Sequence, residues 1–447
     1  MRVKALKSNY KPTDIAVGSA RSCYFGKNII TPEDAAKWDK KEMLLNSIFK
    51  AGHHTTLMHY HFTFLIEGMS RLLIWRLLHS HPFYNSEQVS QRYAKMKPEN
   101  FTFPKNADKE KWQKYYEKMF FYYETLIEKL IPEIEKVLPK FKKKEAKKRA
   151  QEFARYLLPL GMNAHLYHTI NVITALRYIN AVKVIPEAKD EAKEFIELIK
   201  KEMLNIDKSL APLIEFAENE EVVFPSINIE KIKKQKNVKE NVEVFDVVEY
   251  DFELNANYAG VLRASNIYLD EAILGGFNSY IKLSLSADAQ NQRHRRSPAL
   301  RPKLEDIYKR DYYIPPIISS EQIERLYKEA VEFSYDFFEE QKEILGFSEA
   351  AYALLNAHNI EIIEHNDFQE FAHKAQMRLC FNAQEEIFNI VYSQIKKLKE
   401  KTKSADNFMP PCALRFKENI KPICPEGERF CGVKVWKMNF DEYERLI

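Results

Sequence analysis

Two strand-like runs stand out in the pattern of apolar and polar positions along the chain. In HYHFTFLIEG, Tyr60, Phe62, Phe64 and Ile66 fall on alternate positions, which predicts the buried face of a β-strand. The run GFNSYIKLSLS in the second half has the same strand-like character. Each run is followed by a polar stretch that carries histidine and then by a long helical region. The pattern therefore predicts an α+β fold of sheets and long helices.

The chain contains two copies of one unit. AVGSARSCYF at 16–25 resembles AGVLRASNIYL at 259–269, and each precedes one of the strand-like runs. Between Asn366 and Glu400 there is no glycine or proline, whereas the corresponding first-half region is broken by Pro186. The apolar positions of that second-half run predict a buried helical stripe, which consists of Phe368, Phe371, Ala375, Leu379 and Phe381.

The lysine-rich, weakly apolar segment NIEKIKKQKNVKENVEVF marks the join between the copies, and we interpret it as a solvated linker. We expect an N-terminal repeat at 1–227, a linker at 228–242 and a C-terminal repeat with a cysteine-containing tail at 243–447. The two copies are expected to pair as a pseudo-dimer.

The composition and charge of the chain argue against a nucleic acid or a membrane as a partner. The 447 residues suffice for two or three domains, and the net charge of only +4 implies no bulk polyanion, so no nucleic-acid partner is expected. The basic run Lys142–Arg149 is interpreted as a solvated helix end. The apolar run LLIWRLL carries an arginine and is too short to cross a bilayer, and no secretory signal is visible. Five cysteines in a chain of this size indicate a reducing cytoplasm.

The first half is rich in histidine around its strand-like run. A metal site is one interpretation, but no cysteine or carboxylate falls at ligand spacing, so histidines that stack on an aromatic cofactor are favoured. The histidines are His53, His54, His59, His61, His79 and His81. Downstream, SEQVSQRY brings hydroxyl, amide and guanidinium groups together, which suits a phosphate.

The order of strand, EGMSR, helix, histidine-bearing triplet and YNSEQVSQRY resembles the flavin-dependent thymidylate synthases. Their signature is Arg-His-Arg, then seven residues, then Ser. An upstream histidine–threonine segment, an AR..LP element and a later asparagine are also similar to this chain. The first-half positions that carry the resemblance are His53, Thr55, His59, Phe62, Phe64, Gln88, Ser90, Arg92, Ala154, Arg155, Leu158, Pro159 and Asn171.

The first half departs from the family pattern in its cationic positions. The triplet reads His79-Ser80-His81, with one residue too many before Ser90, and the glutamine that normally precedes it is Arg76. The family's helix arginine falls near Val182, and the arginine expected two residues after Asn171 is Ile173. Taken alone, this half resembles an enzyme that has lost part of its site.

The second half carries the missing parts. Gln290 stands at the family spacing before Arg293-His294-Arg295, and QMRLCFNAQEEI places Arg378 at the position of the helix arginine. His373 matches a family His/Asn position one turn earlier. This half lacks the S.QRY loop and has Ala351 at the AR..LP arginine, while Asp367 and Gln369 replace the family's asparagine–arginine pair.

The two sets of losses are complementary. In the family, one chain supplies the triplet and helix arginine, and a partner supplies the loop and AR..LP arginine. The resemblance therefore implies one composite nucleotide site per chain, which is formed by Gln290, Arg293 and Arg378 with Gln88, Ser90, Arg92 and Arg155. The reciprocal site is expected to be inactive, since it contains His79-Ser80-His81, Val182 and Ala351.

The resemblance implies the reductive methylation of dUMP to dTMP, with FAD as cofactor and methylenetetrahydrofolate and NADPH as co-substrates. Arg378 is expected to stabilise negative charge on the uracil, and Ser90 and Arg92 are expected to meet the phosphate. The residues expected to contact FAD are Arg293, His294, Arg295, His53, Thr55, Gln88, Asn171 and His373. Because family members are tetramers of single units, a homodimer of this chain is expected.

Other interpretations remain open at the sequence level. Arg378 can instead form a helix-surface ion pair with Glu385 or Glu386. The cysteines Cys380, Cys412, Cys424 and Cys431 are either ligands of a metal or reduced structural thiols, and their spacing fits no standard pattern. The chain can also be a paralogue that acts on another pyrimidine nucleotide, or a non-catalytic nucleotide-binding assembly protein. No glycine-rich phosphate loop indicates a Rossmann site.

Overall fold

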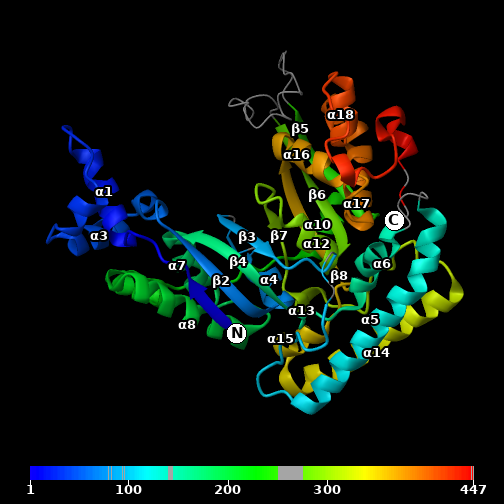
Figure 1. Cartoon of the computed structure of the whole chain (residues 1–447), viewed down its shortest axis with the longest axis horizontal. Helices are drawn as coiled ribbons and strands as arrows, with labels where there is room; N and C mark the ends of the chain where they lie inside the picture. The colour runs from blue at the N-terminus through cyan, green and yellow to red at the C-terminus, as the bar shows by residue number, and fades with distance from the viewer. Residues whose placement is uncertain are drawn as a thin grey trace. The chain divides into compact units, whose positions relative to one another are not determined.

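The computed structural model describes residues 1–78, 80–81, 83–92, 94, 96–138, 144–249, 275–443 and 445. The chain divides into two compact units, whose helices and strands are labelled in Figure 1. Unit 1 comprises Met1–Lys118, Pro159–Pro225 and Ser334–Leu354, and unit 2 comprises Met119–Leu158, Ser226–Phe333 and Leu355–Ile447. Each unit therefore includes a segment from the other half of the sequence. His79 and the run at 259–269 lie outside the described residues.

Each unit contains a four-stranded antiparallel sheet, and the two sheets have the same strand order. In unit 1 the order is β1 (Arg2–Ala5), β2 (His61–Ser70), β4 (Asn163–Asn171), β3 (Tyr84–Gln88). In unit 2 it is β5 (Val242–Glu249), β6 (Gly275–Ser284), β8 (Asn359–Asp367), β7 (Ala299–Leu300). The predicted mixture of sheets and helices in two copies is confirmed, and their pairing as a pseudo-dimer stays a prediction.

The predicted alternation in β2 is confirmed. Phe62, Phe64 and Ile66 are buried to 1% exposure or less, and the intervening positions are more accessible. The helices of unit 1 are α1 (Pro12–Tyr24), α2 (Pro32–Ala36), α3 (Lys41–Lys50), η1 (His54–Met58), α4 (Arg71–Leu78), α7 (Val172–Ala181), α8 (Lys189–Ile206), η4 (Lys208–Leu210), α9 (Ala211–Asn219), α15 (Phe347–Ala350) and η6 (Ala351–Ala353). The long helices α5 (Lys109–Val137) and α14 (Glu321–Leu345) contribute residues to both units.

The helical run predicted after Asn366 is divided in the structure. α16 (Phe368–Arg378) ends at the arginine, and α17 (Glu385–Lys399) begins after a short turn in which the Ala383 N–H donates to the Cys380 carbonyl oxygen at 2.8 Å. The other helices of unit 2 are α6 (Ala146–Ala154), η3 (Arg155–Leu157), α10 (Ile229–Lys236), α12 (Leu285–Asn291), α13 (Leu304–Ile307), η7 (Lys403–Asn407), α18 (Pro411–Lys417), η8 (Gly427–Arg429), η9 (Val435–Lys437) and η10 (Phe440–Glu442). Among the described residues, every helix is too short or too polar to cross a membrane.

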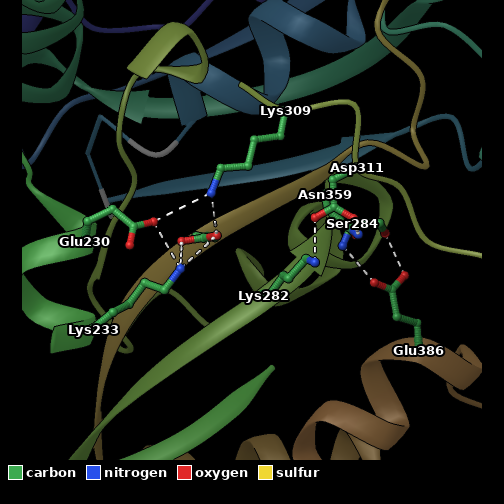
Figure 2. A network of polar contacts seen from close by, with 9 residues as sticks. Glu230, Lys233, Lys282, Ser284, Lys309, Asp311, Asn359 and Glu386 are labelled. Carbon is green, nitrogen blue, oxygen red and sulfur yellow. Dashed lines mark hydrogen bonds and ion pairs between the residues drawn. The ribbon is translucent and has the colours of Figure 1, made fainter. Parts of the chain in front are cut away.

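The segment interpreted as a linker contains α10 and reaches the first residue of β5. Asn228 caps this helix by accepting the Lys231 N–H at 2.9 Å. Lys233 pairs with Glu230 and with Glu361 of β8, with a nitrogen–oxygen distance of 3.1 Å to each. Figure 2 shows Lys233 directed toward Glu230. These contacts attach part of the predicted linker to the sheet of unit 2.

A buried carboxylate organises the strand-to-helix corner in each unit. In unit 2, Glu386 accepts the Ser284 N–H at 2.7 Å and the Ser284 hydroxyl at 2.6 Å (Figure 2), and Tyr156 donates to it at 2.6 Å. In unit 1, Glu191 accepts the corresponding bonds from Ser70, at 2.7 and 2.5 Å, and one from the other repeat's tyrosine, Tyr352, at 2.8 Å. Each unit is thus stabilised by a tyrosine from the other half of the sequence.

The unit 1 carboxylate predicts a pH-dependent stability. Burial raises the pKa of Glu191 from 4.5 to about 7. An acid whose pKa is raised by folding stabilises the native state at low pH, and this contribution is lost as pH rises through the folded pKa. The glutamine side chain does not titrate in this range. We therefore expect the melting temperature of Glu191→Gln minus that of the parent to be roughly 5 °C larger at pH 8 than at pH 5. Thermal melts followed by circular dichroism measure this difference.

The exposed Glu197 of the same helix provides the matched control as Glu197→Gln. A difference between Glu191→Gln and the parent that does not change with pH would show that this carboxyl does not titrate on folding as described.

Candidate functional site

The turn that follows α12 carries the second half's triplet. The Arg293 N–H donates to the Gln290 carbonyl oxygen at 3.3 Å, and the His294 N–H donates to that of Asn291 at 3.0 Å. Gln290 and His294 are buried, whereas Arg293 and Arg295 are exposed. The turn therefore presents the Arg293 and Arg295 side chains to solvent and holds the Gln290 amide and the His294 imidazole inside unit 2.

Arg378 joins this turn from the last turn of α16. Its Nε donates to His294 Nε2 at 2.9 Å, and its Nη2 donates to the Gln290 carbonyl oxygen at 2.9 Å. Burial and the neighbouring cations hold the pKa of His294 well below its usual value, so the imidazole is neutral and its Nε2 accepts. Its Nδ1 then carries the proton and lies 3.5 Å from Glu370 Oε1. The guanidinium is thus fixed in a buried position.

The carboxylates considered as alternative partners of Arg378 have other hydrogen bonds. Glu385 accepts from Tyr313 at 2.6 Å and from Asn389 at 2.7 Å, while Glu386 binds the strand-to-helix corner described above. Burial raises the pKa of Glu385 to about 7. Arg378 itself is only 9% exposed, so its side chain is directed into unit 2 and is not on a solvated helix face.

Arg155 from the first half lies in the same unit. Its Nη2 donates to Gln384 Oε1 at 2.5 Å, and Gln290 Nε2 donates to the same oxygen. The Gln384 amide donates in turn to the Tyr156 hydroxyl. We call this group (Gln290, His294, Arg378, Gln384 and Arg155) the Arg378 cluster. The structure therefore brings a first-half arginine to second-half residues inside unit 2.

Gln384 is a member of the cluster that the sequence interpretation missed. It is fully buried and immediately precedes α17. It falls inside the matched stretch QMRLCFNAQEEI, so the motif marked its position without revealing its role. Its bonds to Arg155 and Gln290 connect a first-half residue with a second-half residue.

The loop candidates of the first half lie in unit 1. Gln88, at the end of β3, accepts from Arg71 Nη1 at 2.6 Å, and Arg71 Nη2 donates to the Val89 carbonyl oxygen. The Ser90 hydroxyl accepts the Arg92 N–H at 3.2 Å. All three candidate side chains, Gln88, Ser90 and Arg92, are half-buried. These residues supply amide, hydroxyl and guanidinium groups within five residues of the chain, and such groups are common ligands of phosphate.

The other residues predicted to contact the cofactor differ in exposure and in hydrogen bonding. His53 and Thr55 are exposed beside or within η1. Asn171 is buried and caps α7 by accepting the Thr174 N–H at 2.8 Å, so it has a structural function of its own. His373 is exposed on α16, with its ring centroid 5.9 Å from that of His294, and thus borders the Arg378 cluster.

The positions expected to form the reciprocal site are apolar or occupied by local contacts. Arg76 is buried and pairs with Glu187, with Nη2 to Oε1 at 2.9 Å. His81 contacts Arg177, and burial together with that charge lowers its pKa to about 4. The remaining two positions, Val182 and Ala351, are buried apolar side chains. Unit 1 therefore has no guanidinium at the position that Arg378 occupies in unit 2.

The four cysteines of the second half gather in unit 2. Burial, with Cys380, Cys424 and Cys431 nearby, raises the pKa of the Cys412 thiol to about 12. The Asn382 amide donates to the Arg429 carbonyl oxygen at 2.7 Å, which attaches the tail to the turn after α16. Among the described residues, no three His, Cys, Asp or Glu side chains are arranged to hold a metal ion.

The Arg378 cluster fits an anionic ligand that also donates a hydrogen bond. Gln290 Oε1 is buried, and no described residue donates to it. An unpaired buried acceptor is costly unless a ligand or water satisfies it. Arg293 follows Gln290 in this turn with an exposed side chain, and the buried guanidinium of Arg378 donates to the Gln290 carbonyl oxygen at 2.9 Å. The donor set suits a nucleotide base with an N–H group and the phosphates of a nucleotide or dinucleotide.

Comparisons with known proteins support the resemblance in both halves. Residues 5–212 and 275–402 match the Thy1 family, described as "Thymidylate synthase complementing protein". The flavin-dependent thymidylate synthase of Clostridium tetani is 28% identical over 227 residues, which span 47% of this chain and 87% of that protein. The one from Pyrococcus horikoshii is 30% identical over 221 residues, 48% of this chain and 84% of that protein.

A crystal structure of Thymidylate Synthase X from Helicobacter pylori with FAD and dUMP aligns with 49% of this chain and 100% of that chain, at 17% identity and a TM-score of 0.34. The family resemblance predicted from the sequence motifs is confirmed by the sequence matches, and it extends over both repeats.

Proposed function

Because the chain belongs to the Thy1 family of thymidylate synthase complementing proteins, we propose that it is a flavin-dependent thymidylate synthase that methylates dUMP to dTMP. The observation that carries the proposal is the Arg378 cluster. It places the candidate guanidinium of the second half beside Gln290 and links both to Arg155 of the first half. This arrangement supports one composite site built from complementary halves.

FAD, reduced by NADPH, would supply the electrons, and methylenetetrahydrofolate would supply the carbon unit. Arg378 binds the pyrimidine and stabilises negative charge that develops on it. A cation fixed in a buried site does this effectively because it needs no reorganisation during the reaction. His294, as a neutral acceptor, orients the Arg378 guanidinium. Gln290 accepts the base N–H through its unpaired Oε1.

The remaining candidates have binding roles in this proposal. The dUMP phosphate is bound by Ser90 and Arg92, with Gln88 and Arg155 also on the nucleotide, as the match to the family loop and AR..LP element supports. Arg293 binds both nucleotide and flavin. The other proposed FAD contacts are His294, Arg295, His53, Thr55, Gln88, Asn171 and His373. The reciprocal positions in unit 1 are inactive, and the chain assembles as a homodimer.

The full-length protein is expected to be purified with bound FAD and to convert dUMP to dTMP when methylenetetrahydrofolate and NADPH are present. Flavin absorbance and chromatography of the products measure both, and UMP and dCMP tested in parallel identify a paralogue with another substrate. Rescue of a thymidine-requiring strain tests the activity in cells. No FAD binding at saturating cofactor would contradict the proposal and indicate a non-catalytic protein.

A further inference from the structure

A buried ion pair lies next to the Arg378 cluster in unit 2. Lys374 Nζ donates to Glu364 Oε2 at 2.6 Å, and the two side chains are 0% and 1% exposed. Asn291 donates to the other carboxylate oxygen at 2.7 Å, and Asn366 donates to Oε2 at 2.9 Å. Burial acts to raise the pKa of Glu364, but the lysine and these hydrogen bonds outweigh it and lower the pKa, so the carboxylate is ionised.

The pair connects the two segments that carry the cluster. Asn291 ends α12, and its carbonyl oxygen accepts the His294 N–H, so it forms part of the triplet turn. Lys374 lies four residues before Arg378 on α16, and residues four apart share one helix face. Glu364 of β8 binds both segments at once. Glu364 therefore connects the turn that carries His294 to the helix that carries Arg378, and these two residues are hydrogen-bonded to each other.

Unit 1 has different residues at the equivalent positions. Glu364 is the sixth residue of β8, and His168 is the sixth residue of β4, the strand in the same place of the unit 1 sheet. Lys374 is the seventh residue of α16, and Tyr178 is the seventh residue of α7, which follows β4 as α16 follows β8. The two repeats therefore differ at both members of the pair.

The unit 1 residues form a neutral stack. The rings of His168 and Tyr178 lie with centroids 5.7 Å apart and planes at 12°. Burial lowers the pKa of His168 to about 3, so its imidazole is uncharged at neutral pH. The same strand and helix thus fold around uncharged side chains. Because buried ion pairs seldom add stability over such replacements, the fold alone does not account for the charged pair.

We propose that the Glu364–Lys374 pair positions the active site of unit 2 by holding the turn with His294 against the helix that carries Arg378. It occurs in the repeat that retains the cluster, and a neutral stack replaces it in the repeat that has lost it. The catalytic consequence rests on the proposed function, whereas the structural consequence does not. Glu364 and Lys374 are positioning residues in this proposal and do not contact the reacting atoms.

The double substitution Glu364→His with Lys374→Tyr tests the proposal, because it introduces the side chains that unit 1 already accommodates. Hydrogen–deuterium exchange of the full-length protein is expected to speed up at least about 10-fold in residues 290–297 and to stay unchanged in strands β6 and β8. The turnover number with dUMP is expected to fall at least about 10-fold. Tyr178→Phe, which removes only a hydroxyl from the unit 1 stack, is the matched control and should change neither quantity.

A second variant tests the proposal if the double variant does not fold. Asn291→Leu introduces the residue type of Leu77, which is the seventh residue of α4 as Asn291 is of α12, and it leaves the ion pair intact. Faster exchange of residues 290–297 is again expected. If exchange in this segment matches the parent in both folded variants, or if exchange rises throughout unit 2, the positioning proposal is wrong. A parent protein without dUMP turnover would instead refute the proposed function, and the exchange comparison would still decide the positioning role.

Discussion

Replacing Arg378 with alanine is expected to lower the turnover number for dTMP formation by about 100- to 1000-fold, because one preorganised cation at the pyrimidine is removed. Arg378 is buried and held by His294 and the Gln290 carbonyl oxygen, so the loss of its charge is not replaced by a mobile neighbour. Steady-state kinetics with dUMP, together with flavin absorbance, separate a loss of chemistry from a loss of cofactor.

The first-repeat counterpart provides a matched control. Counted from the first residue of each helix, Val182 directly after α7 corresponds to Arg378 at the end of α16, and it is also buried. Val182→Ala should leave the turnover number within about twofold of the parent, since unit 1 is proposed to be inactive. If Arg378→Ala retained parental turnover with bound FAD, the assignment of this residue would be incorrect.

Arg155→Ala is expected to raise the KM for dUMP by about 10- to 100-fold, because a charge-assisted contact contributes about 1.5–3 kcal/mol. This substitution has the second-largest expected effect. It lies in the first half of the sequence, yet Arg155 is in unit 2 and bonds to Gln384. Initial rates measured over a range of dUMP concentrations give the change, and thermal melts confirm that the variant is folded.

Arg149 of the preceding helix is the control for a general loss of positive charge. Its bonds to Glu152 and Asn382 are long, both at 3.4 Å. Arg149→Ala should leave the KM for dUMP within about twofold. Equal KM values for Arg155→Ala and the parent would show that Arg155 does not bind dUMP.

Much of the architecture could be predicted from local sequence patterns. The alternation of Phe62, Phe64 and Ile66 identified the central strand of unit 1, and the duplicated order of elements is present as two sheets of equal topology. The complementary losses in the two halves led to the expectation that Arg155 works with second-half residues. Arg155 donates to Gln384 of the second half, whereas its action on a nucleotide stays a prediction. The strand could be predicted from alternation within one short segment, and the duplication from comparing the two halves of the sequence.

Other features depend on tertiary contacts and could not be predicted. The helix ends after Arg378 although no glycine or proline lies there. Gln384, which follows, is buried and accepts hydrogen bonds from Arg155 and Gln290. A lysine such as Lys374 is normally exposed, so its burial against Glu364 is visible only in the folded unit. The partners of Gln384 and Lys374 lie at least ten residues away in the sequence, beyond the reach of local periodicity.

The number of dUMP molecules bound per chain tests the central claim most directly. Isothermal titration calorimetry of the FAD-loaded full-length protein measures it without requiring turnover. The complementary halves predict saturation at one dUMP per chain, because the reciprocal positions in unit 1 carry Val182 and Ala351 where the site needs arginines. Saturation at two dUMP per chain would contradict the account of one composite site.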